Sequence, residues 1–130
     1  MKIYIDGLFY RGSGIGRYYE SLTKEFAKRG ISIVTCVPER LKKDFEKDFA
    51  GIPNIESMFV DYAKFSLKGF WKQSSVLKDL ENKVNLFFYP HINLPFWVPK
   101  NTFIVIHDLI PLTKWWRRNK FKKELFGALI

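Results

Sequence analysis

The 130-residue sequence predicts an α/β fold, a Rossmann-like, doubly wound parallel sheet with helices on both faces. Short apolar runs alternate along the chain with longer amphipathic stretches, the order that builds parallel sheets from strand–helix–strand units. The later runs, NLFFY and TFIVI, are apolar throughout, which is typical of strands buried on both faces. With 47% hydrophobic and 18% aromatic residues, the chain can form the core of a single domain.

The first half of the chain predicts two strands and two helical stretches. Residues 2–6 alternate as a strand, and a glycine-rich segment separates them from a helix at about 15–28. Gly30 ends that helix after two cations, as is common at a helix C-terminus. A second strand, 31–37, is dense in β-branched residues, and a charged helical stretch at about 38–49 follows.

The second half continues the same order. A turn at 51–54 precedes a short strand near 57–60, and a helix is expected at about 67–82. Two apolar strands follow, at 85–89 and 102–106. The sequence shows no internal repeat and no linker, so one domain spanning residues 1–130 is expected.

Charge and composition narrow the function classes. The formal net charge of +9 favours anionic partners such as phosphates, nucleic acid or an acidic membrane face. Cys36 is the only cysteine, which excludes an internal disulfide framework; it lies in an apolar strand, where a packing role is expected. Neither a signal peptide nor a membrane-spanning stretch is recognisable, and no cysteine–histidine cluster suggests a metal site. The expected location is the cytoplasm.

The segment between the first strand and the first helix, here called the glycine loop, contains Gly12, Gly14, Gly16 and Arg17. In a doubly wound sheet, ligands bind beyond the carboxyl ends of the strands, where this loop lies. Glycine permits positive φ and close approach of a ligand, and a helix N-terminus attracts anions. Arg17 opposes the helix dipole, so either an anion or a surface carboxylate is expected near it.

The loop does not match the common nucleotide motifs. Its Gly-x-Gly-x-Gly spacing differs from the dinucleotide fingerprint and from the P-loop, and no acidic residue ends the second strand. A simple NAD site is therefore disfavoured. A tight strand-to-helix turn that binds nothing is an equally good explanation of the loop taken alone.

The only two histidines, His91 and His107, each follow an apolar strand at the expected ligand-binding edge. A structural role is the commoner explanation for His91, and a functional role is favoured for His107. Asp108 is positioned either to orient His107 or to cap the next segment. Asp6 ends the first strand and is expected to hold backbone N–H groups of the glycine loop.

These motifs together resemble a known family. GSGIGRY at 12–18, a first helix closing in AKRG at 27–30, and VIHDLIPL at 105–112 look like the N-terminal domain of group 1 retaining glycosyltransferases. That family has two Rossmann-like domains facing each other across a cleft, the GT-B architecture. The resemblance covers nearly the whole chain and keeps the order of the motifs.

The resemblance implies the roles of several residues. It places the glycine loop near the diphosphate of a nucleotide-sugar donor and near the acceptor. It makes His107 the catalytic residue that contacts the donor sugar, supported by Asp6 and Asp108. His91 and Asn93 would line the acceptor side. No metal and no cofactor beyond the donor substrate are implied.

The resemblance also implies what this chain lacks. The family's C-terminal donor domain has no counterpart here, so the chain is expected to be the acceptor-binding half of a two-domain hexosyltransferase and inactive alone. The expected acceptor is a glycan or a lipid-linked glycan, as in cell-surface polysaccharide biosynthesis.

A basic, aromatic tail supplies the competing hypotheses. Residues 114–123, KWWRRNKFKK, interleave aromatic side chains with six cations and are expected to be helical. Trp115, Trp116, Arg117 and Arg118 would suit peripheral docking on the inner face of an anionic membrane. Packing of these aromatics on protein is the structural alternative. A stand-alone module that binds such a membrane or nucleic acid is the alternative function, with nucleic acid the less favoured partner.

Overall fold

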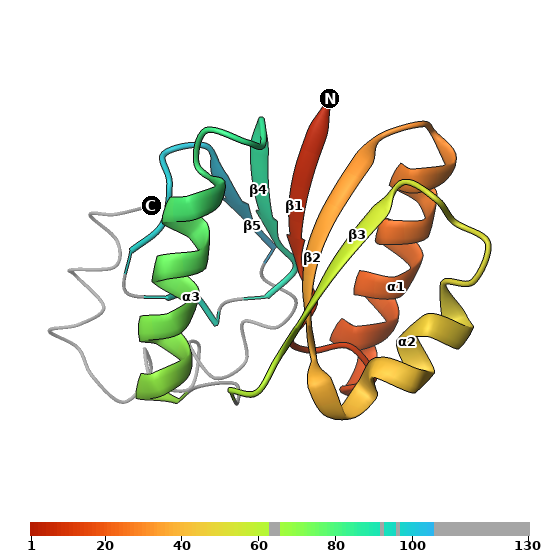
Figure 1. Cartoon of the computed structure of the whole chain (residues 1–130), viewed down its shortest axis with the longest axis horizontal. Coiled ribbons are helices and arrows are strands. Elements are labelled where there is room, and N and C mark those ends of the chain that lie inside the picture. The colour runs from red at the N-terminus through yellow and green to blue at the C-terminus, as the bar shows by residue number, and fades with distance from the viewer. Residues whose placement is uncertain (63–65, 92, 96, 106–130) are drawn as a thin grey trace, which may run out of the picture.

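A computed structural model describes residues 1–62, 66–91, 93–95 and 97–105. Five parallel strands form one sheet in the order β3-β2-β1-β4-β5, which confirms the predicted fold class (Figure 1). Their bounds are β1 Lys2–Asp6, β2 Ser32–Pro38, β3 Ile55–Val60, β4 Leu86–Tyr89 and β5 Thr102–Ile104. Every strand lies within two residues of its predicted position.

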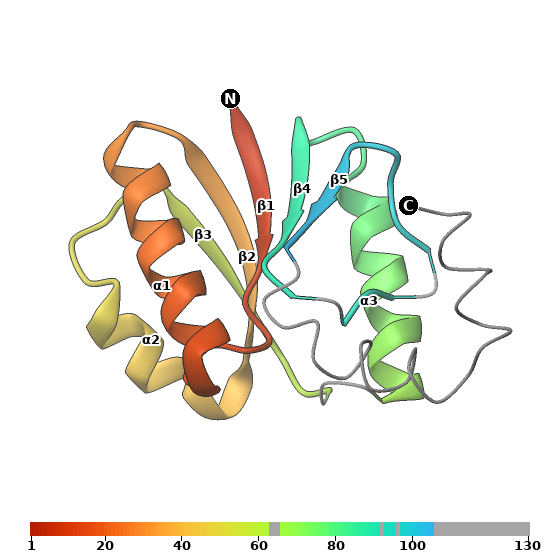
Figure 2. The ribbon, with the colours of Figure 1, turned by 180° about the vertical axis from the view of Figure 1, so that it is seen from behind.

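Helices cover both faces of this sheet. Helices α1 (Ser13–Lys28) and α2 (Lys42–Asp48) lie on one face, and α3 (Leu67–Leu80) lies on the other (Figures 1 and 2). The predicted stretch 38–49 divides into a short 3₁₀ turn, Glu39–Leu41, and the helix α2. Among the described residues, none of these helices is both long and apolar enough to span a membrane.

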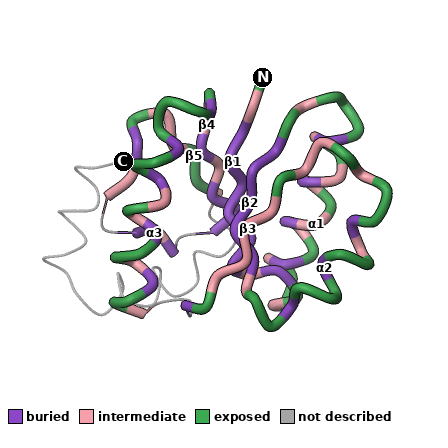
Figure 3. The backbone as a smooth tube through the Cα atoms, in the orientation of Figure 1, coloured by how far each residue is buried: buried purple, intermediate pink, exposed green. Residues whose placement is uncertain are grey.

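Alternation along the strands creates two cores. In β1, Ile3 and Ile5 pack toward α1 and α2, whereas Tyr4 between them packs toward α3. The buried residues follow the strands and the inner sides of the helices (Figure 3). Cys36 in β2 is fully buried in the α3-side core, which confirms its predicted packing role.

Strand β5 corrects one expectation. The run 102–106 was expected to be buried on both faces, but Phe103 and Ile104 are 56% and 44% exposed. Within the described part of the chain β5 hydrogen-bonds only to β4, so it forms an edge of the sheet. An edge strand has a neighbour on one side only, and a continuous apolar run does not distinguish it from a central strand.

The order in which strands are added to the sheet reverses beside β1. It builds β1, β2 and β3 outward to one edge and then returns to place β4 on the other side of β1. The carboxyl ends of β1 and β4 are therefore neighbours at a topological switch point, with Ile5 paired to Phe88. Ligands of open parallel sheets bind at such points. The glycine loop follows β1 here, and His91 follows β4.

Candidate functional site

The glycine loop leads into α1 without a side-chain cap. Gly12 is the N-cap residue, no side chain accepts a hydrogen bond from the first turn, and no acidic residue lies in that turn. Helix N-termini usually satisfy their first N–H groups with a Ser, Thr, Asp or Asn cap. The first turn of α1 thus keeps its partial positive charge without an acidic side chain to offset it.

The positive φ angles of this loop lie at unexpected residues. Arg11 and Ser13 both have φ of 63°, whereas Gly12 between them is extended with φ of −110°. Positive φ had been expected at the glycines. For residues with a Cβ the left-handed region costs about 1–2 kcal/mol. The surrounding contacts therefore hold the loop in a strained conformation.

The two glycines inside α1 have different surroundings. A Cβ on Gly16 would lie 2.5 Å from the carbonyl oxygen of Phe9, so the helix packs on the preceding loop there. A Cβ on Gly14 would meet no heavy atom within 4 Å. Gly16 is thus needed for packing, whereas Gly14 leaves space free at the helix N-terminus.

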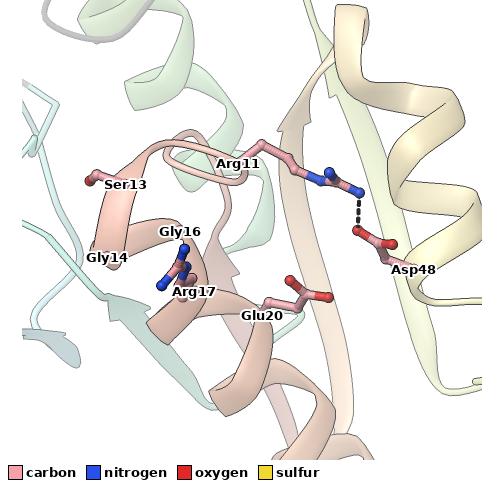
Figure 4. Close-up of a pocket in the computed structure, with 7 residues that line it drawn as sticks. All are labelled: Arg11, Ser13, Gly14, Gly16, Arg17, Glu20 and Asp48. Atoms are coloured by element: carbon pink, nitrogen blue, oxygen red, sulfur yellow. Dashed lines mark hydrogen bonds and ion pairs between the residues drawn. The ribbon is translucent and has the colours of Figure 1, made fainter.

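That free space is part of a pocket at the carboxyl edge of the sheet (Figure 4). Its volume is about 650 Å³, within the usual range for small-molecule sites. The lining comes from the loop, the first two turns of α1 and the end of α2: Arg11, Ser13, Gly14, Gly16, Arg17, Glu20 and Asp48.

Both carboxylates that line this pocket are in ion pairs. Arg11 binds Asp48 at 2.7 Å, and the Tyr10 hydroxyl donates to the same carboxylate. The Tyr10 hydrogen bond, together with Arg11, lowers the pKa of Asp48. Glu20 accepts from Lys24 at 2.9 Å. Within the described ranges Arg17 forms no ion pair, although the carboxylates of Glu20 and Asp48 line the same pocket.

A second cluster lies at the switch point, where β1 and β4 end. The carboxylate of Asp6 is fully buried and accepts hydrogen bonds from four donors. These are the Tyr4 hydroxyl at 3.0 Å, the Leu8 N–H at 3.2 Å, the Gln73 amide, and His91 Nε2 at 2.5 Å. The Leu8 contact places Asp6 under the segment that leads into the glycine loop, close to its expected role. A buried carboxylate is stable only with such a set of donors.

His91 is fixed by both of its ring nitrogens. Nδ1 accepts the backbone N–H of Asn93 at 3.0 Å, so the hydrogen-bond pattern assigns the proton to Nε2, which donates to Asp6. The ring also packs between Phe9 and Tyr89, with centroids 4.4 and 5.5 Å away. His91 and Asn93 are each 2% exposed. The structural explanation favoured for His91 agrees with this geometry.

Sequence reasoning missed several members of these clusters, and three of them depend on distant partners. Gln73 comes from α3, Asp48 from α2, and Tyr10 from the loop before the glycines. Each reaches its partner across a long sequence separation and belongs to no recognisable motif. Of the four donors around Asp6, Tyr4 and Leu8 are sequence neighbours, whereas His91 and Gln73 reach it only through strand pairing and helix packing.

The remaining predicted site residues lie outside the described part of the chain: His107, Asp108, Trp115, Trp116, Arg117 and Arg118. Their roles stay predictions. Among the described residues, no group of three or more His, Cys, Asp or Glu side chains could hold a metal ion.

Comparisons with family models, curated proteins and solved structures found no match to this chain. The parallel α/β sheet is thus established by its own topology, and the glycosyltransferase family stays a prediction from the motifs.

Proposed function

We propose that this chain is the acceptor-binding half of a glycosyltransferase that uses a nucleotide-sugar donor. The pocket at the start of α1 would contact the donor diphosphate, and the acceptor would be a glycan or a lipid-linked glycan. The family resemblance of the motifs supplies the reaction class. The observation that carries the proposal is an uncapped helix N-terminus beside an arginine without an ion-pair partner among the described residues.

The chemistry of sugar transfer suits this pocket. Breaking the bond between sugar C1 and the diphosphate places negative charge on the leaving group. Backbone N–H groups, a helix N-terminus and cations stabilise such charge as it develops. The first turn of α1 supplies the N–H groups, and Arg17 supplies a cation that forms no ion pair among the described residues.

The buried cluster supports this site without entering it. Asp6 connects β1, the segment before the glycine loop, α3 and the loop after β4 through its four hydrogen bonds. Preorganised donors stabilise a transition state better than donors that must first be ordered. Asp6 and His91 are positioning residues in this proposal, and His107 remains the predicted contact to the donor sugar.

Binding of inorganic pyrophosphate, UDP-glucose and GDP-mannose to the whole chain tests the proposal. NMR amide shifts should cluster at residues 12–17. Arg17→Ala should weaken pyrophosphate binding by about tenfold, since a charge-assisted contact is lost. Gly14→Ala should weaken it as well, because the added methyl group occupies the open space without disturbing the fold.

Arg29→Ala is the matched control. It removes the same charge from the other end of α1, where the Arg29 side chain is 71% exposed, and binding should not change. Equal losses in both arginine variants would indicate general charge attraction. Binding of pyrophosphate without binding of either nucleotide sugar would show an anion site but would give the glycosyltransferase function no support. The membrane and nucleic-acid alternatives depend on residues 114–123, outside the described chain.

A further inference from the structure

The outer surface of α3 carries a small cavity lined by aromatic and polar side chains. Its volume is about 330 Å³, and its lining is Trp71, Ser74, Ser75, Lys78 and Trp97. Four of these residues come from one helix at spacings of three, four and seven, so they share one face of α3. Trp97 comes from the segment before β5 and forms the opposite wall.

Trp71 is the unusual residue of this cavity. Trp71 is large and mostly apolar, yet it is 75% exposed. Exposed aromatic surface beside a hollow often marks a binding site. Its removal should leave the core unchanged, because the buried residues of α3 are Gly69, Gln73, Leu77 and Leu80.

The opposite wall is held in place before any ligand binds. The backbone N–H of Trp97 donates to Ser74 Oγ at 3.2 Å, and that hydroxyl donates to the carbonyl of Phe70 at 2.9 Å. The ammonium of Lys78 lies 5.5 Å from the centre of the Trp97 ring. These contacts orient Trp97 and keep a cation at the rim of the cavity. Ser75 adds an exposed hydroxyl group.

We propose that this cavity binds a pyranose ring of an oligosaccharide. The C–H face of a pyranose is apolar and slightly positive, and the face of an indole carries negative π density. Stacking on Trp71 would cover its exposed ring. The hydroxyl groups at the edge of the sugar ring would form hydrogen bonds with the Ser75 hydroxyl and the Lys78 ammonium. Both of these groups lie on the α3 side of the cavity.

The local charge favours a sugar over an anionic membrane. Two further lysines of α3, Lys68 and Lys72, lie 3.8 and 3.3 Å from the carboxylate of Asp61. That carboxylate offsets part of the basic charge an anionic surface would require. Trp71 and Trp97 also line a hollow, which suits a single sugar ring.

This binding site does not rest on the proposed function. Helix α3 covers the sheet face opposite to α1, so the cavity and the glycine-loop pocket lie on different faces (Figures 1 and 2). A sugar on α3 should shift the indole NMR signals of Trp71 and Trp97. Pyrophosphate should instead shift the backbone amides at the start of α1, so either site can fail alone.

The test is a titration of the whole chain with cellohexaose, maltohexaose and chitohexaose, followed by the indole N–H signals of NMR spectra. At least one oligosaccharide should shift the signals of Trp71 and Trp97, which the variants Trp71→Phe and Trp97→Phe assign. Trp71→Ala should weaken binding by about tenfold or more, and Trp71→Phe should retain part of it. Lys78→Ala should weaken it less than Trp71→Ala.

Leu67→Ala is the matched control, because Leu67 is also 75% exposed on α3 but does not line the cavity. Its oligosaccharide binding should equal that of the unchanged chain. The proposal is wrong if none of the three oligosaccharides shifts either indole signal. It is also wrong if Trp71→Ala and Leu67→Ala lower binding equally. Binding only to vesicles of phosphatidylglycerol, lost in both variants, would assign the surface to a membrane.

Discussion

Asp6 shows how much of this site depends on one buried carboxylate. Its four donors come from β1, the following loop, α3 and the loop after β4. Each donor was removed from water on folding, so its hydrogen bond to Asp6 replaces one to solvent. Asp6 therefore links the two strand ends at the switch point more directly than any apolar contact does.

Replacing this carboxylate should be costly even with an isosteric side chain. Asp6→Asn removes the charge and turns an NH₂ group toward donors, which leaves at least one buried donor unsatisfied. The free energy of unfolding should fall by about 1–3 kcal/mol, measured by urea denaturation.

Asp61→Asn is the control for this change. Asp61 has a 58% exposed side chain and, among the described residues, forms ion pairs with surface lysines alone, so its loss should change stability by less than about 1 kcal/mol. If the two variants lost equal stability, the Asp6 hydrogen bonds would not carry the role assigned to them.

At the scale of elements, α1 depends on close packing against the sheet. Leu22 and Phe26, extended by Tyr18 and Tyr19, predict the apolar side of this helix. Of these four only Tyr19 is buried, and it lies on a buried line with Gly16, Thr23 and Ala27. Small side chains on that line let the helix approach the strands, and the Tyr19 hydroxyl bonds Thr35 Oγ1 at 2.7 Å. Leu22 and Phe26 flank this line and are partly buried.

The two glycines of α1 should therefore respond oppositely to alanine. Gly16→Ala forces a methyl group against the carbonyl of Phe9 and should destabilise the chain by about 1–3 kcal/mol. Gly14→Ala should leave stability unchanged or raise it by up to about 1 kcal/mol, because alanine favours the helix and its methyl group meets open space.

Thermal and urea unfolding of both variants measure this difference. A loss of stability in Gly14→Ala would show that its backbone, rather than its pocket, requires glycine. It would also remove that variant as a test of ligand binding.

At the scale of the whole molecule, the core under α3 holds a titratable thiol. Burial raises the pKa of Cys36 from 9.0 to about 12, because the thiolate would lose its water. The folded protein thus holds this proton more tightly than the unfolded chain does. The resulting stability is fully present below pH 9 and is lost as the pH rises from 9 to about 12.

Cys36→Ala should make this alkaline loss smaller. Between pH 8 and pH 11, the free energy of unfolding should fall less steeply in the variant than in the unchanged chain. Burial and the hydrogen bond to Asp48 raise the pKa of Tyr10 to about 12. Tyr10 therefore adds the same pH dependence of unfolding to both proteins. Urea denaturation at the two pH values gives the comparison. If the free energy of unfolding fell equally with pH in both proteins, burial would not raise the pKa of the Cys36 thiol.

The amino-acid sequence determined the elements and their order. Alternation, β-branched runs and continuous apolar runs located the five strands of the described part of the chain, and the charged and amphipathic stretches located its helices. These signals are local, because each depends on the conformational and burial preferences of neighbouring residues. The glycine loop at the carboxyl edge was predictable for the same reason, since strand polarity and loop position follow from the order of elements.

Only the tertiary structure decided which distant side chains meet. Strand pairing set β4 beside β1, which brought His91 to Asp6, and the packing of α3 added Gln73. It also placed β5 at an edge and Arg11 beside Asp48. Such contacts depend on strand register and helix position rather than on local preference. A polar residue in a sequence does not show which buried donor it will satisfy.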